Sequence, residues 1–218
     1  MTTEIAPEGI DTLEDVDVAN TSGVVGDNVQ EALDTLDVAS AGGSLILLAT
    51  ATASASASID FVSSIDSTYD IYEVHIISAI PATDNTEMIL RSSSDGGSTF
   101  DSGASAYTTH IIAGTNGQAV QNSGGDTNSI LLTNSGQNVG NAAGESINGI
   151  IRLYAPSNTA LFTQFGINMN WLTADTDSGV TIGSGSREEA AIVNGLQLKM
   201  LVGDIISGEF KLYGVKKS

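Results

Sequence analysis

Residues 71–77 of the chain read IYEVHII, and residues 210–215 read FKLYGV. In both stretches apolar side chains recur at every second position, while the positions between them are mixed in character. Successive side chains of a β-strand point to opposite faces of a sheet, so a period of two gathers the apolar side chains on one face. Both stretches are therefore predicted to be β-strands with one buried face.

The chain after residue 44 continues as short apolar runs between turn clusters. Gly, Ser and Thr make up 71 of the 218 residues, and only 15% of the residues are charged. Ten strands are predicted, at residues 45–50, 59–63, 69–79, 87–92, 106–112, 129–133, 147–154, 161–171, 191–201 and 209–215. Their spacing, and separators such as SDGG, GTNG, SGG, DTDSG and GSGS, predict a mainly β domain, an antiparallel β-sandwich or jelly roll.

Residues 49–58 read ATATASASAS and are open to two interpretations. As a strand, this stretch would place every Ala on one face, where a neighbouring surface could approach closely. As low-complexity sequence, it would be a flexible connector.

The first 44 residues differ from the rest in charge. They contain ten acidic residues and no Lys or Arg, and the first basic residue of the chain is Arg91. This break predicts an N-terminal attachment or oligomerisation segment over residues 1–43 and a β domain over residues 44–218. Within the segment, DNVQ at residues 27–30 has the form of a capping box, which predicts a short helix over about residues 28–38.

The apolar residues of that helix form a single stripe. Val29, Ala32, Leu33 and Leu36 stand at positions i, i+3, i+4 and i+7. A helix of about eleven residues is not stable alone in water. The stripe therefore needs a partner, either the chain's own β domain or identical helices of sister chains.

Charge and cysteine content exclude several classes of function. The chain has 7 Lys and Arg against 26 Asp and Glu, a net charge of −19, and no Cys. Nucleic-acid backbones and anionic lipid headgroups bind clustered basic residues, so we expect no nucleic-acid partner and no membrane insertion. We also expect synthesis in the cytoplasm without Sec export, because no signal peptide or long apolar stretch is found. Without Cys there is no disulfide, thiolate metal site or cysteine nucleophile.

Residues with catalytic or metal-binding chemistry are few. His75 and His110 both fall in predicted strands, lack the spacing of a metal site, and are expected to be structural or surface residues. Asp175 and Asp177 share a loop with a glycine that could begin a calcium site, but the further ligands of an EF-hand are missing. No catalytic, cofactor-binding or metal residue is predicted, and we expect the chain not to be an enzyme.

Residues 93–100, SSDGGSTF, fit the Asp-box pattern S-x-D-x-G-x-T-[WF]. In this pattern the Ser and Asp side chains hold the amides of a turn, the glycines accept positive φ, and the aromatic ring packs beneath. A single copy predicts a hairpin and no activity.

Three segments together resemble bacteriophage virion structural proteins. SGVVGDNVQEALDTLD at residues 22–37 resembles the NVQ-A-L helix of phage fibre and tail proteins. LRSSSDGGSTFDSGASAY at residues 90–107 resembles a DGGSTF hairpin of virion proteins, and ISGEFKLYGV at residues 206–215 is similar to their GxFxLYG last strand. The motif residues cover about a fifth of the chain and none of them is catalytic.

This resemblance implies a homotrimer located on the virion. The implied protein is a short fibre or decoration protein, attached to other virion proteins of the tail, neck or head through residues 1–43. Val29, Ala32, Leu33 and Leu36 would form the oligomer interface, and the β domain would project outward and contact the host. The chain departs from the pattern in having no long shaft and no aromatic-rich tip.

Two other functions remain open. A carbohydrate-binding module that recognises a host-surface glycan would use exposed aromatic rings, for which Tyr107, Tyr154 and Trp171 are the candidates, although each also suits core packing. A glycan depolymerase usually requires a long β-helix, and the chain shows no such repeat. The acidic N-terminal residues could seek a basic socket on a partner or simply maintain solubility.

Overall fold

The structure is a computed structural model that describes residues 44–116, 121–133, 136 and 138–217. Leu45–Ser218 form one unit, and Met1–Ser44 fall outside it. The helix predicted over residues 28–38, with its stripe of Val29, Ala32, Leu33 and Leu36, lies outside the described residues. The described residues form twelve strands and no helix.

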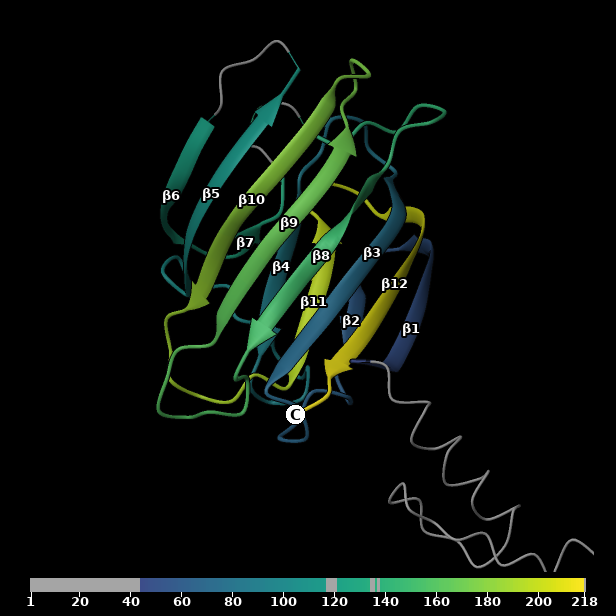
Figure 1. The fold of residues 1–218 in the computed structure, drawn as a ribbon. Coiled ribbons are helices and arrows are strands. Elements are labelled where there is room, and N and C mark those ends of the chain that lie inside the picture. The colour runs from purple at the N-terminus through teal and green to yellow at the C-terminus, as the bar shows by residue number, and fades with distance from the viewer. Residues whose placement is uncertain (1–43, 117–120, 134–135, 137, 218) are drawn as a thin grey trace, which may run out of the picture. The chain divides into compact units, whose positions relative to one another are not determined.

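The strands form two antiparallel sheets (Figure 1). The larger sheet contains, in spatial order, β1 (Leu45–Ser56), β12 (Ile205–Val215), β3 (Ile71–Pro81), β8 (Ile147–Tyr154), β9 (Gln164–Leu172), β10 (Ser178–Arg187), β5 (Tyr107–Thr115) and β6 (Gln121–Thr127). The smaller sheet contains β2 (Ile59–Phe61), β11 (Gly195–Met200), β4 (Met88–Ser93) and β7 (Ile130–Leu131). The prediction of a mainly β, antiparallel fold is confirmed.

One hydrophobic core lies between the two sheets. In β3 the buried residues Tyr72, Val74 and Ile76 alternate with more polar positions, as the period of two predicts. Their side chains belong to the same buried cluster as Leu90 of β4 and Leu198 of β11 in the smaller sheet. The smaller sheet therefore covers the inner face of the larger one and leaves the opposite, outer face to solvent (Figure 1).

Each of the ten predicted strands corresponds to an observed strand, although most begin or end a few residues away. The bounds of Ile147–Tyr154 agree with the prediction. Residues 49–58 belong largely to β1, which runs to Ser56 and pairs with β12. There Ala53 is buried while Thr50 and Thr52 are exposed, so the repeat is a strand as far as Ser56, but Ala55 is exposed and the Ala side chains do not all share one buried face.

Two strands were not predicted. β6 contains the SGG cluster and β10 contains GSGS, and both clusters were wrongly assigned to turns. The glycines of β10 make room for large neighbours: a Cβ at Gly179 would collide with the indole of Trp171, and one at Gly185 would lie 2.8 Å from Ile130 Cδ1. The strand is glycine-rich because side chains from adjacent elements fill the space that its own would occupy.

The Asp-box turn forms as predicted, but the predicted hairpin is wrong. Ser93 Oγ accepts the amide of Gly97 (2.9 Å), and Asp95 Oδ1 accepts the amide of Thr99 (2.9 Å). The backbone and side-chain hydrogen bonds from Thr99 lower the pKa of Asp95 to about 2. The strands on either side do not pair, because β4 belongs to the smaller sheet and β5 to the larger. The Asp-box loop is a connection between the two sheets.

Arg187, the last residue of β10, binds the Asp-box loop through its side chain. Its side chain is 2% exposed, Nε donates to Asp101 Oδ2 (2.6 Å), and Nη2 donates to Glu189 Oε2 (2.7 Å). Nη2 also lies 3.4 Å from Ser94 Oγ. A buried guanidinium therefore ties the loop after β4 to the end of β10.

We predict that Arg187→Met lowers the free energy of unfolding by about 3 kcal/mol, the lower end of the range for removing one partner of a buried ion pair. The loss should approach that lower end because Glu189 is 69% exposed and stays hydrated without its partner. Urea denaturation at pH 7 measures this difference. Arg91→Met is the matched control, because Arg91 makes one exposed hydrogen bond of 3.3 Å and should change stability by less than about 0.5 kcal/mol. Equal losses in the two variants would contradict the role of Arg187.

Candidate functional site

The outer face of the larger sheet, which is turned away from the smaller sheet, carries the candidate site. Alternate residues of β8, β9, β10 and β5 point to this face, and the antiparallel register aligns them in rows across the strands. One row consists of Tyr154, Gln164, Ser186 and Thr108, and the next consists of Arg152, Gly166, Ser184 and His110. These two rows bring an aromatic ring, an amide, hydroxyl groups and an imidazole together.

A cleft of about 310 Å³ lies over these rows. Its wall includes Tyr154, Gln164, Ser184, Ser186, Thr108 and His110, and none of the described side chains that line it is acidic. Tyr154 lies over Gly166, where even an added Cβ would only reach ordinary contact distance, 3.4 Å from the Tyr154 hydroxyl oxygen. The cleft can therefore stack an apolar surface against Tyr154 and exchange hydrogen bonds around it.

A second cleft of about 260 Å³ adjoins the first and shares Tyr154 and Gly166 with it. Its other lining residues include Arg152, Asn168, Ile150 and Ile182. This cleft is more apolar at one end because Ile182 borders it. Together the two hollows run from the polar end of the outer face toward an apolar end.

Glu73 of β3, the strand next to β8, binds side chains at the polar end of the outer face. It is only 6% exposed, its Oε1 accepts a 2.7 Å hydrogen bond from Arg152 Nε, and its Oε2 lies 2.9 Å from His75 Nε2. Burial raises the pKa of Glu73, but hydrogen bonds with His75 and Arg152 and the charge of Arg152 outweigh burial and lower it. Glu73 thus holds Arg152, whose side chain is 51% exposed, at the wall of the second cleft.

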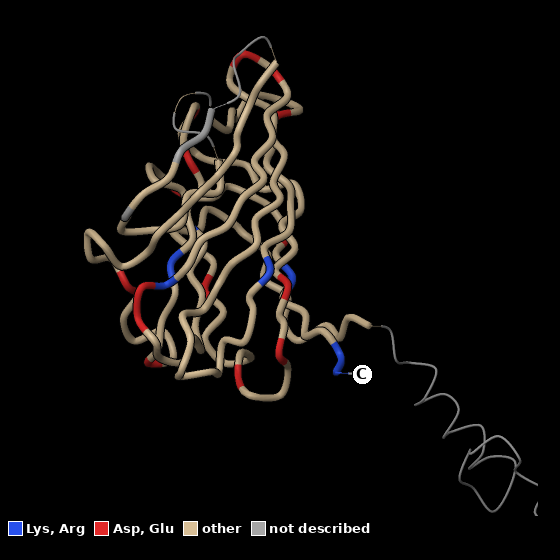
Figure 2. Tube along the Cα trace, turned by 60° about the vertical axis from the view of Figure 1, so that its left-hand side comes forward, with Lys and Arg blue, Asp and Glu red and all other residues tan. Residues whose placement is uncertain are grey.

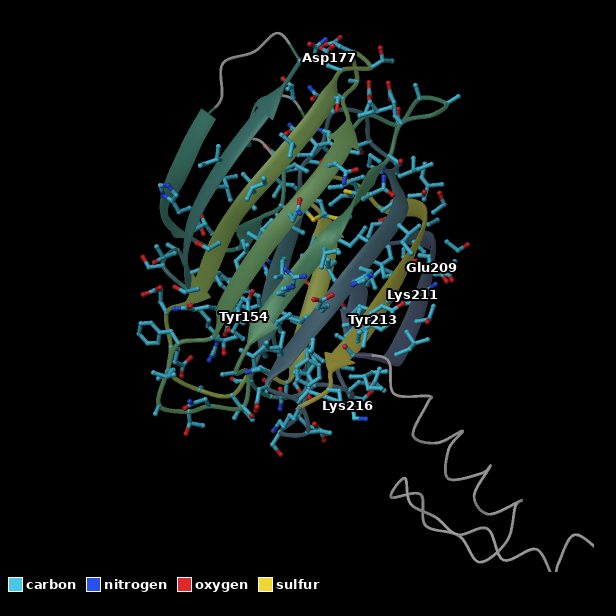
Figure 3. All side chains as sticks on the ribbon, viewed as in Figure 1. Tyr154, Asp177, Glu209, Lys211, Tyr213 and Lys216 are labelled. Carbon is cyan, nitrogen blue, oxygen red and sulfur yellow. The ribbon has the colours of Figure 1, made fainter. Side chains whose placement is uncertain are left out.

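Residues of β12 extend the group formed by Glu73, Arg152 and His75 toward the edge of the sheet. The ring of Tyr213 lies 4.7 Å from the ring of His75, centre to centre, and Lys211 Nζ lies 3.1 Å from Glu209 Oε2. Figure 3 labels Tyr213, Lys211 and Glu209 along β12, with Tyr154 farther across the sheet. The charged groups on this part of the face are therefore paired with one another.

Of the three aromatic residues proposed to contact a glycan, only Tyr154 presents its ring to solvent, at 40% exposure. Tyr107 is fully buried, and its hydroxyl accepts the amide of Ser92 at 2.6 Å. Trp171 is 2% exposed and packs over Gly179. In this structure Tyr107 and Trp171 are core residues, the other assignment open to them from sequence.

The two histidines occupy different environments. His75 pairs with Glu73, whereas His110 of β5 lines the first cleft. Gln164, Ser184 and Ser186 are not among the predicted site residues: Ser184 and Ser186 fall in a predicted turn, and Gln164 falls in the strand predicted over residues 161–171, where no motif marks it. A strand signal was nevertheless present, since Val180 and Ile182 alternate with smaller residues.

The loop that carries Asp175 and Asp177 is closed by its own hydrogen bonds. Thr173 Oγ1 accepts the amides of Asp175 (3.3 Å) and Asp177 (3.1 Å), and Asp177 Oδ1 accepts Asn116 Nδ2 (3.3 Å). Within the described ranges, no three His, Cys, Asp or Glu side chains gather in a way that could hold a metal ion. Over the same ranges, the chain forms no helix with the length and apolar character needed to cross a membrane.

We predict that Glu73→Gln lowers the free energy of unfolding at pH 7 by about 1 kcal/mol, since it weakens two hydrogen bonds to a charged group. A carboxylate with a lowered folded-state pKa stabilises the fold above its unfolded pKa, near 4.5, and loses this contribution as the pH falls below that value. The difference between wild type and variant should therefore shrink on acidification, as urea denaturation from pH 7 to pH 3 would show. Glu209→Gln, at a 40% exposed partner of Lys211, is the control and should have little effect at any pH. A Glu73→Gln effect independent of pH would contradict the assignment.

No protein-family model, curated protein or solved structure matches this chain.

Proposed function

We propose that the chain is a non-enzymatic structural protein of a bacteriophage virion, a short trimeric fibre or decoration protein. Residues 1–43 attach it to the tail, neck or head, and the β unit is displayed from the particle and contacts the host. The observation that carries this proposal is the resemblance of three separate segments to phage virion proteins. Two of them, residues 90–107 and 206–215, supply elements of the β unit: the Asp-box connection and strand β12.

The finer fold class that we propose is a β-sandwich. Two antiparallel sheets that share one core support this class. Such a domain needs no disulfide or metal at this size, which suits a chain without Cys.

The distribution of charge supports attachment through the N-terminal segment. Ten of the 26 acidic residues stand in the first 44 positions, where no basic residue offsets them. In the β unit, Lys211 pairs with Glu209 (3.1 Å) and Lys217 with Asp70 (3.0 Å). A basic socket on another virion protein is the partner that we propose for the acidic segment.

Native mass spectrometry of the full-length protein tests the trimer. We expect three times the chain mass of 22.3 kDa. Leu33→Asp combined with Leu36→Asp should shift the mass toward the monomer, because charged residues would face one another at the proposed interface. Thr35→Asp, between them in the sequence but off the stripe, is the matched control and should remain trimeric. A monomeric wild-type protein would contradict the proposal.

A second candidate function is recognition of a carbohydrate in the first cleft. An exposed aromatic ring beside amide and hydroxyl groups favours it, because sugars present both apolar CH faces and hydroxyl groups. Among the described side chains, none that lines the cleft belongs to Asp or Glu.

Screening the wild-type protein against a glycan array tests this candidate. For any glycan that binds, Tyr154→Ala should weaken binding by about tenfold or more, since removal of an aromatic contact costs on the order of 1–2 kcal/mol. Tyr154→Phe keeps the ring and should retain most of the affinity. An array without binding, or binding unaffected by Tyr154→Ala, would refute carbohydrate recognition in this cleft.

A further inference from the structure

The outer face of the larger sheet has an apolar end that begins at the second cleft, where Ile182 is one of the lining residues. Ile112 of β5 and Ile182 of β10 are directly paired across the strands and are 53% and 60% exposed. Val180 lies two residues from Ile182 on the same face and is 44% exposed. We call these three residues the apolar patch. Such neighbouring branched side chains on a flat sheet face favour removal from water.

The patch is also without charge in a strongly acidic molecule. β5, β9 and β10 contain no Asp, Glu or Lys, and their one Arg, Arg187, is buried, while His110 of β5 lies two residues from Ile112 on the same face. Most acidic residues of the β unit stand instead in loops near the ends of the strands (Figure 2). A cationic partner would be drawn to those loops and not to this face.

We propose that the apolar patch is a contact surface for a second copy of this chain. Two copies carry the same excess of negative charge, so a surface that exposes no carboxylate is where they meet with the least repulsion. The apolar patch meets this condition. The inference rests on the proposed trimer, which would hold the β units near one another and allow a weak contact to form.

The shape of the outer face supports a second copy of the chain as the partner. Ile182 protrudes at the border of the second cleft, which has a volume of about 260 Å³. In a three-fold assembly the contacts run head to tail, so the isoleucine of each copy can enter the hollow of the next copy around the ring. Asn168, paired with Ile182 across the strands and also lining the cleft, supplies a polar group at the rim.

The first cleft lies at the other end of the same face. Its residues Tyr154, Gln164 and Ser186 share one cross-strand row, whereas Ile182 and Ile112 share another row two positions farther along from Ser184 and His110. The row of Tyr154 therefore lies at the edge of a contact that is centred on the apolar patch. The proposed contact centres on Ile182 and Ile112, which do not line the first cleft, but the second cleft that would receive the isoleucine shares Tyr154 and Gly166 with it.

The natural absence of Cys gives a direct test. In the full chain, a single Ile182→Cys substitution places one thiol in the patch, and Val202→Cys places one in the turn between β11 and β12, where Val202 is 56% exposed. Both proteins are labelled with a maleimide under native conditions, and the native mass of each is measured alongside. We expect the thiol at position 182 to react about tenfold more slowly than the thiol at position 202, as when the contact is closed about nine-tenths of the time.

Combination with Leu33→Asp and Leu36→Asp shows whether the protection is intermolecular. If these changes give a monomer, the thiol at position 182 should react as fast as the one at position 202. Equal labelling rates in a trimer would overturn the patch contact and leave the proposed trimer standing. Slow labelling that persists in a monomer would overturn the patch contact as well. A monomeric wild-type mass would overturn both proposals.

Discussion

The outer face of the larger sheet owes its composition to burial of the inner face against the smaller sheet. Tyr72 and Val74 of β3 and Leu153 of β8 are fully buried there. Because side chains alternate, this burial forces Glu73, Arg152 and Tyr154 to the outer face. A slip of one residue in the register would reverse both faces, so the free energy of core burial also fixes the geometry of the candidate site.

The same alternation explains how far the sequence could predict this fold. Strands such as β3 and β12, with large apolar residues on the inward positions, are evident from a period of two. β10 is periodic too, but its larger apolar residues Val180 and Ile182 point outward and its glycines point inward. From the sequence alone these glycines indicate a turn. The side chains that fill the space beside them, Trp171 and Ile130, belong to other elements.

The candidate site was predictable only in part, for a related reason. Tyr154 could be proposed from sequence, but its separation from the buried Tyr107 and Trp171 depends on which face each strand buries. The ion pairs could not be predicted from the sequence, since Glu73 and Arg152 are 79 residues apart and Asp101 and Arg187 are 86 residues apart. Short-range pattern does not encode such long-range pairings, which follow from strand order.

Charge and apolar surface act together on this chain. Exposed branched side chains on a flat sheet promote unregulated association, and natural β proteins commonly prevent it with charged residues at the hazard itself. Here β5, β9 and β10 expose no carboxylate, and the net charge of −19 is carried elsewhere. Repulsion between whole molecules then opposes chance encounters, while screening over about 8 Å at physiological salt allows copies already held together to make contact. In the proposed trimer, residues 1–43 would supply that proximity, so the patch would join only the β units of one assembly.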